Sequence, residues 1–185
     1  MELRWPSTHE LASYVAALET GWSPNTMDAD AGRTELAAIV RDPESFLASL
    51  VDREAAGPPI ELPDGSLAQR LPGYRKWMWD GQFCGSIGFR WQPGTEQLPP
   101  HVLGHIGYAV VPWKRGRGHA TEALRLILDD VVDVGLSFVE VTTDHENVAS
   151  QRVIEANGGV MIERFTYPDA FGRGAGLRYR ITVRE

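Results

Sequence analysis

The sequence has one cysteine and no long apolar run. Cys84 is the only thiol among 185 residues, which excludes a disulfide within the chain and fits a reducing compartment. No apolar stretch approaches the roughly 18 residues that a membrane-spanning helix needs. The opening residues, MELRWPSTHE, lack the cationic start and the apolar stretch of a secretory signal. We therefore expect a cytoplasmic protein that does not bind membranes.

An excess of basic residues is also missing. Lys and Arg total 18 against 25 Asp and Glu, so the formal net charge is −7. This balance argues against general affinity for nucleic acid and mildly favours cationic ligands. Apolar residues make up 43% and charged residues 23%, which is typical of a soluble globular protein. Because this length suits one ordinary domain and no linker or internal repeat is visible, we expect a single domain over residues 1–185.

Hydrophobic periodicity predicts an α/β protein with a mixed sheet. Asp80-Gly81 lies between two strand-like runs and predicts a two-residue hairpin turn with positive φ. Asp42-Pro43 predicts a helix cap followed by a first-turn proline. The predicted elements are a strand over 1–5, a helix over 7–18, a split helical region over 34–53, a loop over 55–73, strands over 74–79, 82–91 and 102–111, a helix over 118–134, a strand over 136–143, a helix capped by Asn147, and strands over 160–167 and 177–184 joined by a glycine-rich turn.

The stretch VVPWKRGRGHATEAL, residues 110–124, places a basic, glycine-containing loop between a strand and a helix. The first turn of a helix has unpaired N–H donors and a partial positive charge, which suit a phosphate group. Gly116 and Gly118 allow the backbone to approach a ligand closely. The spacing is neither that of a P-loop nor that of a dinucleotide fingerprint, which would need a third glycine at Thr121. A solvated loop whose glycines only turn the chain remains the alternative.

Two motifs together resemble a known family. HIGYAVVPWKRGRGHATEAL, followed by VTTDHENVASQRVIEANGG, resembles the two central motifs of the GNAT acetyltransferase superfamily, and is most similar to predicted bacterial acetyltransferases and ribosomal-protein N-terminal acetyltransferases. The resemblance is strong over 102–165. It implies a mixed, mostly antiparallel central sheet that splays midway, with helices on both faces. Residues 74–185 would form the sheet and the acetyl-CoA-binding core, and 1–73, which matches loosely, would shape substrate choice.

The resemblance implies acetyl-CoA as the cosubstrate and no metal. The pantetheine arm would pair with the backbone of Val110 and Val111, and Asn147 and Ser150 would contact it from the other side. The N–H groups expected to hold the pyrophosphate belong to Arg115, Gly116, Arg117, Gly118, His119 and Ala120. Many relatives are dimers, so a homodimer is a further expectation.

The implied reaction transfers an acetyl group to a primary amine of a small molecule or of a peptide or protein N-terminus. An alkyl amine with a pKa of ~10 is mostly protonated at neutral pH, so a base or a water relay must take its proton. His105, on the predicted 102–111 strand, is the first candidate for the base, because an imidazole titrates near physiological pH. Glu140 is the reserve. A hydrogen-bonded, inert histidine is the alternative for His105. At about 3.3 Å per strand residue, His101 lies too far from His105 to share a metal ion.

The leaving thiolate needs an acid, and this chain lacks the tyrosine that is expected to supply the proton. Many relatives carry a tyrosine seven residues after the asparagine of the second motif, where this chain has Ile154. Tyr108, Ser150 or water would then protonate the thiolate. The same difference keeps open a second hypothesis, namely a catalytically silent acyl-CoA-binding sensor or interaction module of the same fold.

Overall fold

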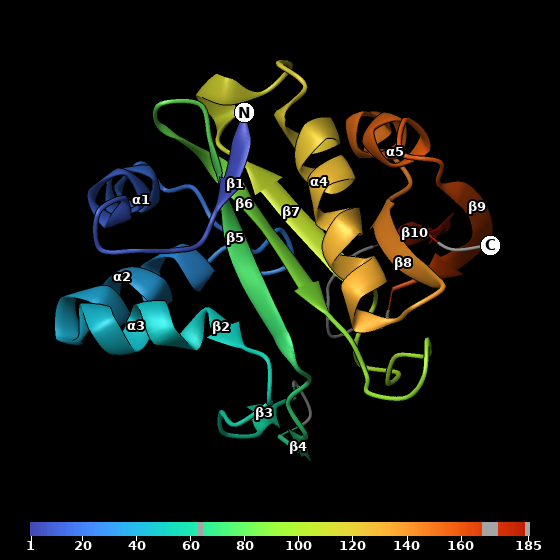
Figure 1. Cartoon of the computed structure of the whole chain (residues 1–185), viewed down its shortest axis with the longest axis horizontal. Helices are drawn as coiled ribbons and strands as arrows, with labels where there is room; N and C mark the ends of the chain where they lie inside the picture. The colour runs from blue at the N-terminus through green and yellow to red at the C-terminus, as the bar shows by residue number, and fades with distance from the viewer. Residues whose placement is uncertain (63–64, 168–173, 184–185) are drawn as a thin grey trace.

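The computed structural model describes residues 1–62, 65–167 and 174–183. Its elements are shown in Figure 1. Along the chain they are β1 (Glu2–Arg4), α1 (Leu11–Glu19), α2 (Ala31–Arg41), α3 (Pro43–Ser49), β2 (Val51–Asp52), β3 (Ile60–Glu61), β4 (Leu67–Ala68), β5 (Gly73–Trp79), β6 (Phe83–Arg90), β7 (Ile106–Val110), a 3-10 turn (Pro112–Lys114), α4 (His119–Val134), β8 (Phe138–Asp144), α5 (Val148–Glu155), β9 (Val160–Thr166) and β10 (Ala175–Thr182).

The strands form two main sheets. The first has the order β1-β5-β6-β7, with β2 also paired to β5, and the second has the order β8-β10-β9. Neighbouring strands within each are antiparallel. Helix α4 connects β7 of the first sheet to β8 of the second. This is the predicted mostly antiparallel sheet that divides in the middle.

Helices cover both faces of the first sheet, because successive strand residues point to opposite sides. On one face, Met78, Ile87 and Phe89 belong to a buried cluster with residues of α4. On the other, Trp77 belongs to a cluster with Tyr14 of α1 and other residues of α1–α3. Figure 1 shows α1–α3 and α4 on opposite sides of β5 and β6. Helices α1–α3 therefore pack on the face away from α4.

The sequence predicted the start of α3, and it predicted both ends of α4 to within one residue. Asp42 accepts a hydrogen bond from Ser45 N at 3.0 Å and caps α3, whose first residue is Pro43. Helix α4 begins at His119, directly after Gly118, and ends before Gly135. Both glycines are left-handed, with φ of +77° and +89°, a conformation that favours glycine.

Other expectations need correction. Trp79 pairs with Phe83, so three residues rather than two connect β5 to β6, because a bulge between Met78 and Trp79 shifts the register. Strand β7 begins at Ile106 and not at residue 102. The glycine-rich turn predicted between the last two strands falls largely within 168–173, which lie outside the described residues.

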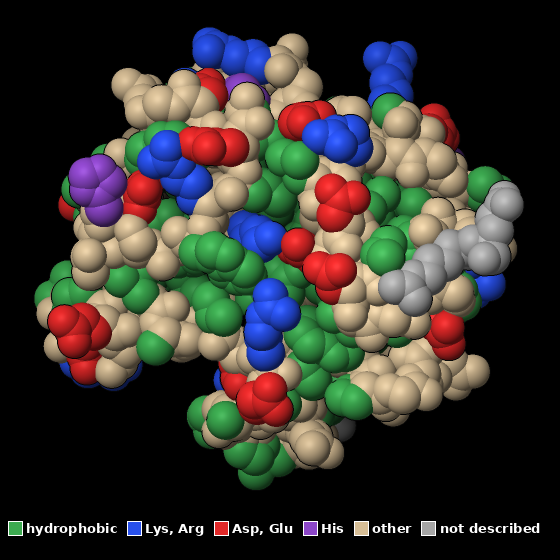
Figure 2. All heavy atoms as spheres, in the orientation of Figure 1, with side chains coloured by type: hydrophobic (Ala, Val, Ile, Leu, Met, Phe, Trp, Pro, Cys, Tyr) green, Lys and Arg blue, Asp and Glu red, His purple; other side chains and the backbone are tan. Residues whose placement is uncertain are grey.

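Acidic and basic side chains alternate over the face of the molecule in Figure 2, without a large patch of either sign. One contact of this mixed kind joins Lys76 Nζ to Asp130 Oδ2 at 2.5 Å. Within the described part of the chain, no helix is long and apolar enough to cross a membrane.

Candidate active site

A gap opens between β7 and β8, and backbone groups line both of its sides. Arg90 N donates to His105 O, and Val111 N donates to Cys84 O, so the odd-numbered residues of this stretch bond to β6. In an antiparallel pair the alternate residues then point their N–H and C=O groups the other way. Ile106, Tyr108 and Val110 consequently present theirs to the gap. On the opposite side, the bond from His145 N to Ala175 O sets the same alternation in β8. Thr142 of β8 therefore presents its N–H and C=O groups to the gap.

The gap closes at His105 and Glu140. His105 N donates to Glu140 O at 2.8 Å, and Glu140 N donates back to the imidazole Nδ1 of His105 at 3.0 Å. The imidazole thus supplies an acceptor where a continuous sheet would supply a carbonyl. Beside this pair, Gly104 lies so close to β8 that a Cβ there would stand 3.0 Å from Glu140 O. These contacts fix where the two sheets begin to separate, and we call them the His105–Glu140 clasp.

A cavity of about 490 Å³ lies along the gap. Its lining includes Tyr108 of β7, Thr142 of β8 and Ser150 of α5. The loop between α1 and α2, residues 24–27, lines it from the N-terminal side. The cavity therefore connects the gap between the sheets with the segment expected to shape substrate choice.

The predicted phosphate loop lies at the start of α4. Gly116 and Gly118 have φ of +71° and +77°, and a Cβ on either would meet nothing within 4 Å. No side chain caps the first turn of α4, and residues 115–118 are exposed. Exposed N–H groups at an uncapped helix start can bind a phosphate group, so the loop has the geometry that its sequence predicted.

Val110 and Val111 differ in what they can offer. Val110 faces the gap, where its carbonyl accepts a hydrogen bond from Arg115 Nε at 3.2 Å. Val111 N donates to Cys84 O, and Val111 O accepts from Lys114 N. The expected pairing of Val111 with a ligand is therefore wrong as to its backbone, because both of its polar groups are already bonded.

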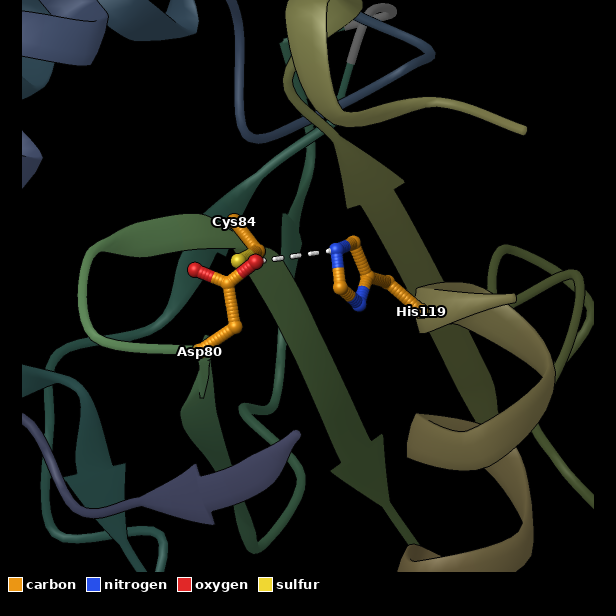
Figure 3. A group of neighbouring side chains, drawn as sticks. All are labelled: Asp80, Cys84 and His119. Carbon is orange, nitrogen blue, oxygen red and sulfur yellow. Dashed lines mark ion pairs between the residues drawn. The ribbon is translucent and has the colours of Figure 1, made fainter. Parts of the chain in front are cut away.

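The side chain of His119 turns inward from this loop. Its Nε2 lies 3.3 Å from Asp80 Oδ2, without the geometry of a hydrogen bond, and Cys84 lies beside them (Figure 3). Lys114 Nζ contacts both Asp80 oxygens, at 2.8 and 3.0 Å. The hydrogen bond from Lys114 is the main reason that the pKa of Asp80 falls to about 2. These ion pairs attach the phosphate loop to the β5–β6 connection. Asp80, Cys84 and His119 are also residue types that can ligate a metal ion, but Lys114 occupies both oxygens of the carboxylate.

Tyr108 and Ser150 meet across the gap. The phenol oxygen lies 2.8 Å from Ser150 Oγ, and both residues line the cavity. Burial raises the pKa of Tyr108 to about 12, so the phenol stays protonated at neutral pH. Asn147 also lines the cavity, and its Oδ1 caps α5 by accepting from Ser150 N at 3.1 Å. Ile154 is fully buried in the core and is not among the residues that line the cavity.

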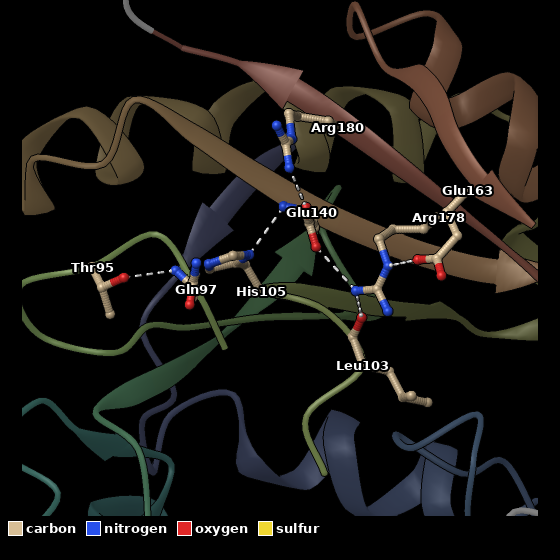
Figure 4. Close-up of polar contacts among 8 residues, drawn as sticks. All are labelled: Thr95, Gln97, Leu103, His105, Glu140, Glu163, Arg178 and Arg180. Atoms are coloured by element: carbon tan, nitrogen blue, oxygen red, sulfur yellow. Dashed lines mark hydrogen bonds and ion pairs between the residues drawn. The ribbon is translucent and has the colours of Figure 1, made fainter. Parts of the chain in front are cut away.

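The two predicted bases bind one another instead of lining the cavity. His105 is fully buried, and burial lowers its pKa to about 4. Because Nδ1 accepts from Glu140 N, the ring proton is on Nε2, which has no hydrogen-bond partner among the described residues. The Glu140 carboxylate contacts Arg178 at 3.0 Å and Arg180 at 2.8 Å (Figure 4). Burial alone would raise the pKa of Glu140, but the hydrogen bonds from Arg180 and Arg178 hold it below its usual value.

The cavity is also lined by two arginines that the sequence did not single out, Arg75 of β5 and Arg90 at the end of β6. His101, which the sequence analysis considered only as a metal ligand, lines it too. His101 Nε2 is buried and has no hydrogen-bond partner in the described part of the chain. No local motif marks the two arginines, because strand register brings them to the site.

Comparisons with known proteins identify the family and the fold. A family model described as an acetyltransferase (GNAT) domain matches residues 28–160, whereas a comparison with curated protein sequences finds no match. Among solved structures, Mycobacterium smegmatis RimJ in complex with a CoA disulfide has 24% identity and a TM-score of 0.64, covering 97% of this chain and 80% of its own.

Two more solved structures have the same fold. The microcin self-immunity acetyltransferase MccE, in complex with acetyl-CoA and AMP, has 9% identity and a TM-score of 0.63, with 97% and 91% of the two chains covered. RimL, a ribosomal-protein alpha-N-acetyltransferase in complex with coenzyme A, has 11% identity and a TM-score of 0.60, with 97% and 92% covered. Because the domain model matches well over half of the chain, this protein belongs to the GNAT acetyltransferase family.

Proposed function

We propose that the protein binds acetyl-CoA between β7 and β8 and transfers its acetyl group to a primary amine. The observation that carries this proposal is the gap itself, whose backbone donors and acceptors lead from the uncapped start of α4 to the Tyr108–Ser150 pair. RimL and MccE, which have the same fold, are complexes with coenzyme A and acetyl-CoA. Their presence among the structural relatives supports the same class of ligand here.

Different residues bind different parts of acetyl-CoA. N–H groups of Gly116 to Ala120 hold the pyrophosphate, with the helix dipole adding favourable charge. The N–H of Arg115, which was also expected there, donates to Pro112 O instead. Val110 pairs with the pantetheine arm once Arg115 moves from its carbonyl. The thioester supplies an activated acetyl group at the far end of the arm. There, gap-facing N–H groups of β7 stabilise the oxyanion, because fixed donors in a site with little water do this well.

Two proton transfers remain, and the cavity offers a group for each. Tyr108, held by Ser150, donates the proton that the thiolate needs. We assign proton acceptance from the amine to His101, acting through water, because it is the histidine among the described residues that lines the cavity. His105 and Glu140 are not part of this assignment, since the clasp occupies His105 Nδ1 and two arginines occupy the Glu140 carboxylate.

The test is turnover with an amine mixture. Acetyl-CoA and the protein are incubated with amino acids, simple amines and short peptides, while thiol release is followed and products are identified by mass spectrometry. Thiol release that requires an amine, together with an N-acetyl product, supports the proposal. Saturable binding of acetyl-CoA without turnover of any amine would instead support a silent acyl-CoA-binding module.

A further inference from the structure

Two arginines lie side by side on the floor of the cavity. Arg75 of β5 is opposite Gly88 of β6, which is opposite Gly107 of β7. Arg90 is two residues beyond Gly88 and therefore on the same face of the sheet. A Cβ on Gly107 would stand 3.7 Å from Arg90 Nη2. The two glycines leave the space above the sheet open, and both arginines line the cavity there.

Only one of these arginines is neutralised. Arg75 Nη1 contacts Glu35 Oε1 at 2.8 Å and Tyr14 OH at 3.2 Å. Arg90 has neither an ion pair nor a hydrogen bond from its side chain to any residue within 1–62, 65–167 or 174–183. Desolvation and the neighbouring Arg75 charge both lower the pKa of Arg90. The side chain of Arg90 is exposed where it lines the cavity, and it has no anionic partner among the described residues, so it is available to a negatively charged ligand.

The position of Arg90 points to the acceptor and not to the cosubstrate. Arg90, Arg75 and His101 line both this cavity and an adjoining hollow of about 250 Å³. The hollow is also lined by Leu50 and Asp52, which precede β5. Leu50 and Asp52 belong to the segment 1–73 that is expected to shape substrate choice. Arg90 bonds to His105, just before β7, whereas the phosphate loop follows the other end of β7. Because the chain has a net charge of −7, it repels anions at long range. An unpaired arginine in this cavity would therefore attract an anionic group only by direct contact.

We propose that Arg90 binds an anionic group on the acceptor, so that the substrate is a small amine that also carries a carboxylate or a phosphate. This inference rests on the proposed acetyl transfer at the same cavity. The planar guanidinium pairs with either anion through two parallel hydrogen bonds. A neutral amine makes no such pair, so Arg90 favours an acceptor that carries an anion over the same amine without one.

The test compares acceptors that differ only in the anion. The pairs are phenylalanine with phenethylamine, for the carboxylate, and phosphoethanolamine with ethanolamine, for the phosphate. Arg90→Met removes the charge, Arg90→Lys keeps it, and Arg41→Met removes a charge from the exposed end of α2 as a matched control. We expect the anionic member of at least one pair to be preferred. Arg90→Met should lower kcat/KM for it by about 10- to 100-fold, the usual effect of a charged hydrogen bond.

The remaining outcomes separate this inference from the proposed function. Arg90→Lys should recover part of the loss, and Arg41→Met should behave as wild type. If neutral amines are acetylated equally well, and Arg90→Met affects both members of each pair alike, the inference is wrong while acetyl transfer stands. If no amine is acetylated, the readout is the shift in Tm caused by acetate or inorganic phosphate in the presence of coenzyme A. A shift that Arg90→Met abolishes supports the anion site, and an equal shift in both proteins overturns it.

Discussion

His105 and Glu140 hold each other at the point where the two sheets separate. Glu140 receives a hydrogen bond on its carbonyl from His105 N at 2.8 Å and donates one from its own N–H to His105 Nδ1 at 3.0 Å. Beyond this pair, β7 and β8 leave the gap that the cavity follows. The clasp explains why a histidine with a lowered pKa lies next to the site without lining it.

The clasp predicts a specific acid sensitivity. His105 titrates near 6.5 when unfolded but near 4 when folded, so between these values the unfolded state binds more protons. The contribution of His105 to the free energy of unfolding is therefore fully present above pH 6.5. It is lost as the pH drops toward 4, and the loss is on the order of 3 kcal/mol. His105→Asn keeps an acceptor for Glu140 N and removes the titration, so urea unfolding from pH 7 to 4 should show a shallower loss of stability.

The same variant tests the earlier hypothesis of a base. If His105 only holds the clasp, His105→Asn keeps most of its turnover, and His105→Leu, which has no acceptor, loses stability. If His105 were the base, His105→Asn would lower kcat/KM by roughly 10²- to 10⁴-fold and remove an acidic limb of the pH profile.

The phosphate loop predicts a charge-sensitive response to acetyl-CoA. A ligand that binds only the folded state raises Tm by mass action. Gly118→Asp should abolish this shift, because it places bulk and negative charge where the pyrophosphate would lie. Gly135→Asp is the matched control: Gly135 is also left-handed, at the other end of α4. Differential scanning fluorimetry should show an ordinary shift for the control, and a shift that survives Gly118→Asp would place the pyrophosphate elsewhere.

Tyr108 is predicted to act as the acid over the whole physiological range. Since burial raises its pKa to about 12, it should cause no loss of kcat on the alkaline side up to about pH 10. Tyr108→Phe should lower kcat by about 10²-fold and leave the Kd for acetyl-CoA nearly unchanged. Ser150→Ala, which removes the partner hydroxyl, should have a smaller effect in the same direction. Full turnover by Tyr108→Phe would assign thiolate protonation to water.

Cys84 is predicted to be unreactive in the folded protein. It is fully buried, and burial, with a further contribution from Asp80, raises its pKa to about 11. At pH 8 its alkylation by iodoacetamide should be slower than that of a free thiol by at least about 10²-fold, because the thiolate is the reactive form. Urea should restore the ordinary rate. Rapid labelling of the native protein would show that the contacts in Figure 3 open readily.

The sequence predicted what depends on neighbouring residues and missed what depends on strand register. The basic loop, its two glycines and the helix after it are one continuous stretch, and the structure has them at residues 115–134. The pairing of His105 with Glu140 joins residues 35 positions apart. A strand pattern predicts which face of the sheet a side chain is on, but not its partner on the next strand. The sequence therefore could not distinguish a structural His105 from a catalytic base.

Register also explains the residues that the sequence analysis overlooked. Arg75 and Arg90 are ordinary strand residues in the sequence, and they meet only because β5 and β6 pair with Arg75 opposite Gly88. The backbone of Val111 was expected to face a ligand, but the alternation of hydrogen bonds directs it to Cys84 and leaves Val110 facing the gap.

A crystal structure of the protein with coenzyme A tests the central claim most directly. The account predicts that the diphosphate lies on the N–H groups of Gly116 to Ala120, that the arm runs along β7 and bonds to Val110, and that the thiol ends beside Tyr108 and Ser150. Arg115 should have left the Val110 carbonyl, and the His105–Glu140 clasp should be unchanged. Coenzyme A bound outside the gap, or with its diphosphate away from this loop, would contradict the account.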